Sequence, residues 1–172
     1  MKGLTAVITR ILEILLIVMM SAMVLDVLWQ VFTRFVLKDP SSFSEELAGF
    51  LLIWIGLLGA VYALHKRSHL GIDILTRRLS GRRRVISEVM IYTVVILFAF
   101  FVMVIGGVRL VSLTLRLRQI SPAMSIPMGY IYTVLPLSGI LFIYYSAAGI
   151  VRTLTAGSAV SGDEDGPAQA GF

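Results

Sequence analysis

The chain of 172 residues has no cysteine, a formal net charge of +5 and 58% hydrophobic residues, with a mean hydropathy of +0.91. Soluble domains are only about 45–50% apolar, so this composition and its long apolar runs indicate an integral membrane protein rather than a soluble or nucleic-acid-binding one. Without cysteine there is no disulfide framework and no thiolate metal site.

The first apolar run predicts a membrane helix over residues 6–36. We expect it to be retained rather than cleaved as a signal peptide, because its apolar core continues past any plausible cleavage point. At about 1.5 Å per residue the run is roughly 45 Å long, more than a ~30 Å hydrocarbon core needs, so it should tilt or protrude. Asp26, Gln30 and Arg34 recur every four residues and are expected to share one face.

Asp26 has two possible roles, because ionisable groups inside a membrane helix usually face protein or water. It could relay a proton or a sodium ion, or it could pair with Gln30, with Arg34 or with a neighbouring chain. Four spans without an internal repeat or a pair of broken helices lack the usual marks of a transporter core, which favours the structural role.

The second apolar run predicts a membrane helix over residues 43–64, joined to the first by a short turn and therefore antiparallel to it. Ser42 followed by Glu45 matches a capping box, and Glu45 and Glu46 both suit the positive end of a helix. The short turn puts Arg34 at the same membrane level, which predicts a contact between Arg34 and one of the two glutamates.

Two faces of this second helix differ in the size of their side chains. One face is bulky and carries a single acid: Glu46, Phe50, Ile53, Trp54 and Leu57. The other is a stripe composed mostly of small residues: Gly49, Leu52, Gly56, Gly59, Ala60 and Ala63. Small residues let membrane helices approach closely, so we expect the stripe to pack against another helix and Gly56→Leu to weaken assembly.

A basic loop over residues 65–84 separates the two halves of the chain. Apolar residues at helical spacing within it predict a short amphipathic helix on the membrane surface, and they are Ile72, Leu75 and Leu79. His65 and His69 are four residues apart, but a zinc site takes more ligands and only Asp73 lies near them. We therefore expect a surface histidine pair, without a metal ion or a cofactor.

The third apolar run predicts a span over residues 89–108 that continues to residue 119. A polar stripe follows this continuation: Arg109, Ser112, Arg116 and Gln119. Arg109 and Arg116 could meet an acidic partner or an anionic solute, or they could reach lipid headgroups. Ser121-Pro122 and Pro127 then predict a loop.

The fourth apolar run predicts a span over residues 129–151, with Pro136 near its start. The polar, acidic tail over residues 156–172 is expected to be disordered, which leaves a four-helix membrane domain over residues 1–155. The basic middle loop is expected to be cytoplasmic, and four spans then put both termini in the cytoplasm.

Three functions are compatible with these features, and none of them is enzymatic. No spacing resembles a nucleophile with a base, a phosphate loop or a paired-carboxylate site, so an enzyme is not expected. The chain could be a non-catalytic transporter subunit, a self-sufficient small channel or carrier using Asp26, or a membrane anchor for a redox enzyme. The anchor is disfavoured because a di-haem site needs histidines on facing helices, whereas His65 and His69 follow one span.

An ordered set of charged, small and proline residues runs through the chain: Arg34, Glu45-Glu46, Trp54, Gly59-Ala60, His69, Asp73, Ser121-Pro122-Ala123, Pro127, Tyr130 and Pro136. From about residue 27 to residue 150 this set resembles the small four-helix membrane subunit, called Q, of tripartite ATP-independent periplasmic (TRAP) transporters. Two positions depart from the family pattern. Phe43 stands where tryptophan is frequent, and Arg67-Ser68 stands where glycine or glutamate is usual.

The resemblance implies a multi-pass protein of the bacterial inner membrane that scaffolds a large, sodium-coupled elevator subunit and moves no solute by itself. The implied partners are that large subunit, a periplasmic binding protein that delivers an organic acid, and membrane lipids, with no nucleic acid. The residues we expect at interfaces or in structural contacts are Asp26, Arg34, Glu45, Glu46, Trp54, Gly56, Gly59, His69, Asp73, Arg109, Arg116, Ser121 and Pro127.

Overall fold

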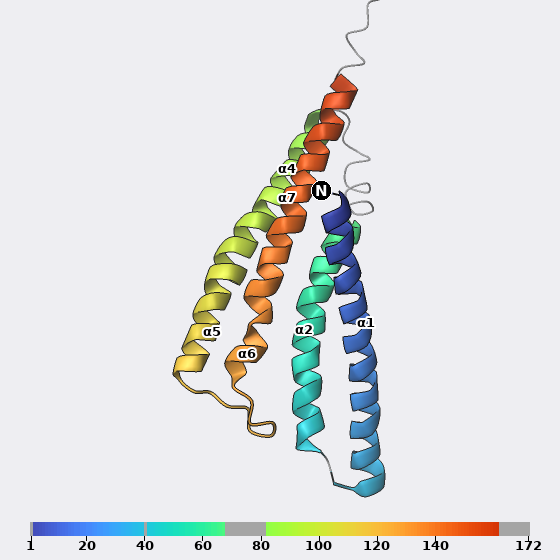
Figure 1. Cartoon of the computed structure of the whole chain (residues 1–172), viewed down its shortest axis with the longest axis vertical. Helices are drawn as coiled ribbons and strands as arrows, with labels where there is room; N and C mark the ends of the chain where they lie inside the picture. The colour runs from blue at the N-terminus through green and yellow to red at the C-terminus, as the bar shows by residue number, and fades with distance from the viewer. Residues whose placement is uncertain (1, 40, 68–81, 162–172) are drawn as a thin grey trace, which may run out of the picture.

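The computed structural model describes residues 2–39, 41–67 and 82–161, and the long elements within these ranges are helical (Figure 1). The first hairpin comprises α1 (Lys2–Phe32), the π-helical turn η1 (Thr33–Leu37) and α2 (Ser42–Arg67). The second comprises α4 (Arg82–Phe98), the π-helical segment η2 (Ala99–Gly106), α5 (Gly107–Arg116), α6 (Met128–Tyr132) and α7 (Val134–Ser161). The predicted amphipathic helix, with His69 and Asp73, lies outside the described residues.

Four stretches of helix are long and apolar enough to cross a membrane: Thr5–Leu37, Ser42–Lys66, Val85–Arg116 and Met128–Thr155. They confirm the predicted all-α membrane fold with four spans. The last helix continues to Ser161, so the expected start of the tail at residue 156 falls inside a helix. Both hairpin turns lie at one end of the bundle, the turn end, and the N-terminus lies toward the other, the terminal end (Figure 1).

The packing side of α1 follows a seven-residue repeat. Most of the buried and half-buried side chains of α1, together with Thr33 at the start of η1, alternate in steps of four and three residues: Thr5, Thr9, Leu12, Leu16, Met19, Met23, Asp26, Gln30 and Thr33. Ile8 and Glu13 are also half-buried. Such a repeat is typical of helices that pack with a slight left-handed crossing. Asp26 and Gln30 share this side as predicted, but Arg34 does not and is exposed. Eight residues along a helix turn a side chain about 80° away, which puts Thr33 rather than Arg34 on the packing side.

Glycines bring the two spans of the second hairpin into close contact. A Cβ atom added to Gly107 would lie 2.9 Å from Cδ of Pro136, and one added to Gly139 would lie 2.8 Å from Cβ of Met103. Gly149 packs in the same way against the ring of Tyr92. Close approach of backbones is how membrane helices gain packing energy that apolar surface alone does not supply in lipid.

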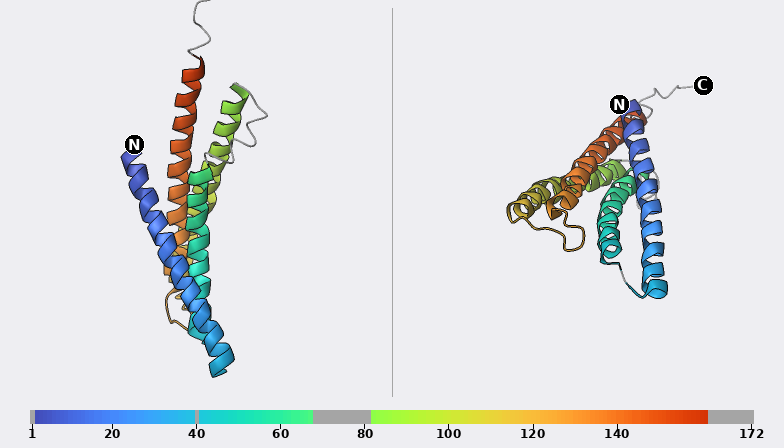
Figure 2. Two further views of the ribbon diagram at one scale, coloured as in Figure 1. Left: turned by 90° about the vertical axis from the view of Figure 1, so that its right-hand side faces the viewer. Right: turned by 60° about the horizontal axis from the view of Figure 1, so that its bottom comes forward.

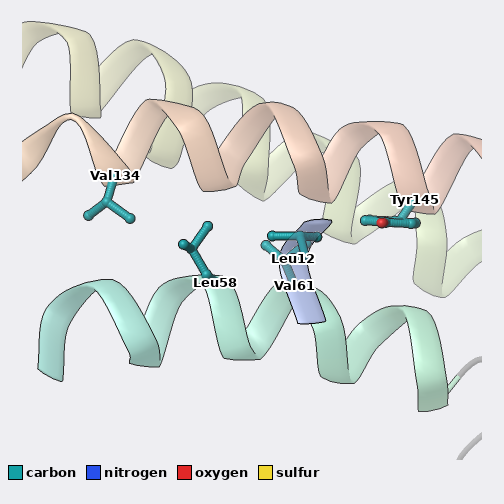
Figure 3. Packing of buried hydrophobic residues seen from close by; sticks show 5 residues of the cluster. All are labelled: Leu12, Leu58, Val61, Val134 and Tyr145. Carbon is teal, nitrogen blue, oxygen red and sulfur yellow. The ribbon is translucent and has the colours of Figure 1, made fainter. Parts of the chain in front are cut away.

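The two hairpins meet along α2 and α7, where a small apolar cluster joins them (Figure 3). Leu58 and Val61 of α2 point toward α7, which carries Val134 and Tyr145, and Leu12 of α1 completes the cluster. Leu58 is 1% exposed and Val61 is fully buried. Below this cluster the ribbons of the two hairpins diverge toward the turn end (Figures 1 and 2). Residues that join the two hairpins there must therefore span a wider gap between the helices.

Candidate functional site at the turn end

The helix α2 is capped by Ser41, one residue before the predicted cap. The Oγ atom of Ser41 lies 3.5 Å from the backbone nitrogen of Ser44, which is the third residue of the helix and the usual donor to a capping side chain. The backbone nitrogen of Glu45 also donates to the carbonyl of Ser41 at 3.3 Å. The predicted capping box of Ser42 and Glu45 is therefore wrong by one residue, and the Glu45 side chain is exposed.

Glu46 anchors the loop that joins α5 to α6. Its Oε2 atom accepts hydrogen bonds from the hydroxyl of Ser121 and from the backbone nitrogens of Ala123, at 3.1 Å, and Met124, at 2.8 Å. Hydrogen bonds to an ionised acceptor are stronger than those between neutral groups. The carboxylate thus ties the first hairpin to the second at the end of the bundle where their helices diverge (Figure 1).

The predicted contact between Arg34 and a glutamate does not form. Arg34 is exposed, and the described part of the chain contains no ion pair between it and Glu45 or Glu46. The helix α1 ends in the π-helical turn η1, with Lys38 in the left-handed region at φ 54°. Glu46 instead turns toward the loop, which offers it three donors that lie 75 to 78 residues away in the sequence.

Both ends of the loop are held by backbone hydrogen bonds. The helix α5 ends at Arg116, and Arg118, two residues further on, lies in the left-handed region at φ 46°. The backbone nitrogens of Arg118 and Gln119 donate to the carbonyls of Leu115 and Thr114, each at 3.1 Å. These two backbone hydrogen bonds at the end of the helix form the Schellman motif, with arginine at the left-handed position where glycine is usual. On the other side Pro127 pairs with Ile120 in an isolated antiparallel bridge and precedes α6. Glu46 therefore binds a preformed loop, with Ser121 1% exposed.

Trp54 supports the start of the fourth span. Its indole nitrogen donates to the backbone carbonyl of Ile131 at 3.1 Å. The helix is interrupted at Thr133, between α6 and α7, because Pro136 has no N–H group and its ring disturbs the preceding turn. A backbone carbonyl at membrane depth needs a partner, and the side chain of Trp54 provides one. Trp54, on the bulky face of α2, thus packs within the chain, whereas Ile53 on the same face is exposed.

The small-residue stripe of α2, in contrast, has no partner within the described chain. A Cβ atom added to Gly49, Gly56 or Gly59 would meet no atom within 4 Å. The exposed residues along this side are Glu45, Gly49, Leu52, Gly56 and Ala60, which we call the open face of α2. At the turn end the open face leads into a cleft of about 430 Å³, lined by Ser42, Glu45, Glu46, Gly49, Phe50, Ile53, Pro122 and Ala123.

Four further residues for which the sequence makes predictions have separate places in the bundle. Arg109 and Arg116 are exposed on α5, near the turn end. Asp26 lies on the packing side of α1, and its Oδ2 atom is buried without a hydrogen-bond partner among the described residues. His65, expected at the surface, is half-buried, and the centroid of its ring lies 4.6 Å from the ring centroid of Tyr145. Within the described ranges no three histidine or carboxylate side chains gather as a metal site would require.

A polar clamp at the terminal end was not predicted. The hydroxyls of Thr5 and Thr9 on α1 each lie 3.0 Å from a tyrosine hydroxyl of α7, those of Tyr144 and Tyr145 respectively. The signal that could have revealed it is the four-residue spacing of the two threonines together with the adjacent tyrosines. The hairpins are therefore joined by polar contacts at both ends, with the apolar cluster between them.

Comparison with known proteins gives a consistent result. A family model described as "Tripartite ATP-independent periplasmic transporters, DctQ component" matches residues 23–156, which is most of the chain. The sialic acid TRAP transporter small permease protein SiaQ of Vibrio cholerae is 32% identical over 107 residues, 62% of this chain and 61% of that protein. A putative TRAP transporter small permease protein of Haemophilus influenzae is 28% identical over 141 residues, 82% of this chain and 86% of that protein.

A longer relative matches over one part of its sequence. The isethionate TRAP transporter permease protein DctMQ of Oleidesulfovibrio alaskensis is 33% identical over 122 residues, which cover 69% of this chain but only 19% of that protein. The aligned part of SiaQ is likewise less than two thirds of its length. A segment similar to this chain thus occurs both as a small protein and inside a larger permease polypeptide.

Proposed function

This chain belongs to the DctQ family of TRAP transporter components, and we propose that it is the non-catalytic small subunit that braces a large permease subunit in the bacterial inner membrane. The observation that carries the proposal is the match to the isethionate permease DctMQ, in which a similar segment is part of a larger polypeptide. Covalent joining in one relative supports a stable association in another where the two parts are separate. The family is a transporter component, and the four spans make the chain a multi-pass inner-membrane protein.

The transported solute is proposed to be an organic acid that a periplasmic binding protein delivers. The names of the relatives mention sialic acid and isethionate, which are both organic anions, and these names support the solute class. In this proposal the large subunit couples uptake to sodium and moves the solute by an elevator motion. The small subunit holds the large subunit in place in the membrane. A rigid bundle suits this role, and the two hairpins are joined at both ends and in the middle.

We propose that both termini are cytoplasmic and that the turn end is periplasmic. Basic residues are dense where α2 ends and α4 begins, at Lys66, Arg67, Arg82, Arg83 and Arg84. An excess of lysine and arginine in a short loop favours the cytoplasmic side. The loop anchored by Glu46 would then face the periplasm, on the side from which a binding protein approaches.

The function is tested by purification and by uptake. We expect a tagged chain, solubilised gently from its own membranes, to bring down a larger membrane permease in equal amounts. Deleting the chain should abolish uptake by the complex, while the purified chain alone in liposomes should move no organic acid and no sodium. The Oδ2 atom of Asp26, which lacks a hydrogen-bond partner among the described residues, is a feature that favours an ion site in this chain. Flux through the purified chain that is lost in Asp26→Asn would overturn the subunit proposal.

We further propose that Arg109 and Arg116 help to dock the binding protein. Both arginines are exposed on α5, at the end of the bundle proposed to be periplasmic. Charged residues at the edge of an interface mainly accelerate association and make it sensitive to salt. Reversing both charges, Arg109→Glu with Arg116→Glu, should raise the binding-protein concentration needed for half-maximal uptake by about tenfold at low salt. The maximal rate should be kept.

The matched control for this experiment is Arg152→Glu. Arg152 is also exposed, but it lies on α7 toward the terminal end, away from the proposed docking side. It should leave the concentration dependence unchanged. If the double variant on α5 behaves like Arg152→Glu at every salt concentration, the arginines reach lipid headgroups instead and the docking proposal is wrong.

A further inference from the structure

The open face of α2 contains glycines against which no residue of the described part of the chain packs. Glycine destabilises a helix relative to alanine, because it loses more backbone freedom on folding. Gly49 and Gly56 are exposed, and an added Cβ atom at either would meet nothing within 4 Å. Neither glycine is needed for the conformation of α2, which is regular from Ser42 to Arg67. The missing side chains therefore serve something outside this chain.

The second hairpin shows what glycines do where their partner is present. Gly107, Gly129, Gly139 and Gly149 each have a neighbouring side chain at 2.5 to 2.9 Å from an added Cβ atom. Each glycine there receives a ridge of the facing helix. Gly49 and Gly56 lie seven residues apart on one side of α2 and form the same kind of groove, without the facing ridge.

Lipid is a poor explanation for this groove. Fluid acyl chains adapt to side chains of any size, so a lipid-facing helix gains nothing from glycine. Many exposed positions of α1 are accordingly large and apolar, including Ile11, Val18, Leu25 and Leu28. A groove lined by small residues fits a rigid apolar rod, which at membrane depth means another helix.

The turn end of the open face carries a charge without a counterpart. Glu45 is exposed beside the cleft of about 430 Å³ and makes no contact with a cation in the described part of the chain. Glu46, which also lines the cleft, is already bonded to the loop through Ser121. The cleft thus combines one available carboxylate with the apolar walls of Phe50 and Ile53, an environment suited to the long stem and charged head of lysine or arginine.

We propose that the open face of α2 seats a transmembrane helix of the large permease subunit, with a lysine or arginine of that helix entering the cleft beside Glu45. This inference rests on the proposed function, because it names the surface through which the chain braces its partner. The isethionate permease, in which a similar segment is part of a longer chain, supports the permease as the occupant rather than a second copy of this chain.

The absence of cysteine makes a direct test possible. Gly49→Cys, Gly56→Cys and Ala60→Cys variants, each labelled with a maleimide photocrosslinker in the assembled complex, should form a product with the large subunit on illumination. Ala22→Cys on α1 and Ala147→Cys on α7 are the matched controls, since both are exposed but lie off the open face. A product of twice the mass of this chain, equal yields from the controls, or no protein product from the open face would each overturn the inference.

Co-purification separates this inference from the proposed function. Gly56→Leu and Glu45→Lys should each reduce the permease recovered with the chain by about tenfold, while the thermal unfolding of the isolated chain stays unchanged. Ala147→Leu should leave both quantities unchanged. If wild-type chain recovers the permease and Gly56→Leu recovers it equally well, the interface lies elsewhere and the proposed function stands. If wild-type chain recovers no permease at all, the proposed function fails first.

Discussion

Replacing Gly139 with leucine is expected to force apart the third and fourth spans and to destabilise the isolated chain by about 1–3 kcal/mol. An added Cβ atom at this position would lie 2.8 Å from Cβ of Met103 and 3.3 Å from the backbone oxygen of Ala99. Neither atom can move away by rotation of a side chain, because a Cβ atom and a carbonyl oxygen follow the backbone. The contact can be relieved only by shifting η2 away from α7.

Two matched variants make this result specific. Gly129→Ala should cost less than Gly139→Ala, because the atoms it meets are the flexible tip of Leu115. Gly56→Leu should not change the stability of the isolated chain, because it meets nothing within 4 Å. Thermal unfolding in detergent, followed by circular dichroism and size exclusion, measures all four variants, Gly139→Leu, Gly139→Ala, Gly129→Ala and Gly56→Leu. Equal midpoints for Gly139→Leu and Gly56→Leu would show that the second hairpin is not held by close packing.

The contrast between these glycines also shows how far the sequence could predict the fold. Four spans and two antiparallel hairpins follow from local features, namely long apolar runs and short turns with proline, and the structure agrees. The faces of the helices that pack within the chain are a different matter. A glycine in the sequence indicates that a close contact is possible but not which helix makes it, so the stripe of α2 was noted and Gly107, Gly139 and Gly149 were not.

The packing side of α1 shows a second limit of prediction from sequence, which comes from the apolar composition of membrane helices. In a soluble helix the apolar residues mark the buried side, but a membrane helix is apolar all round and this signal disappears. The marks that remain are polar residues separated by multiples of seven residues, and these are Thr5 and Asp26 in α1 and Thr33 in η1. The spacing of Asp26, Gln30 and Arg34 predicts a shared face because it repeats every four residues. The true repeat averages three and a half, which excludes Arg34.

The sequence predicts which residues belong to the candidate site but not which of them contact each other. The sequence indicates both Glu46 and Ser121 as candidate residues, yet it predicts that Arg34 meets Glu45 or Glu46 across the short turn. Glu46 and Ser121 are 75 residues apart in the sequence, so their contact does not follow from local spacing. It forms because the two hairpins come together in space. A carboxylate close to free backbone N–H groups binds them readily, and a loop with Ser125 in the left-handed region at φ 55° presents such groups.

Replacing Glu46 with alanine is expected to release this loop from α2 and to lower the thermal midpoint of the chain by several degrees. The change removes the acceptor of three hydrogen bonds, from the hydroxyl of Ser121 and from the backbone nitrogens of Ala123 and Met124. Glu46→Gln should have a smaller effect, because its amide oxygen can still accept from the loop. Ser121→Ala should fall between Glu46→Gln and wild type, since it removes one donor and keeps the carboxylate.

Hydrogen exchange distinguishes a released loop from general destabilisation. In Glu46→Ala the amides of Ala123 and Met124 should exchange faster than in wild type, while those of the apolar cluster around Leu58 and Val61 keep their protection. Glu45→Ala is the control, since Glu45 is the adjacent acid and is exposed. It should leave the loop protected in the isolated chain and weaken only the association with the large subunit. The two neighbouring glutamates would then have separate roles, one inside the chain and one toward its partner, and unchanged loop exchange in Glu46→Ala would refute that division.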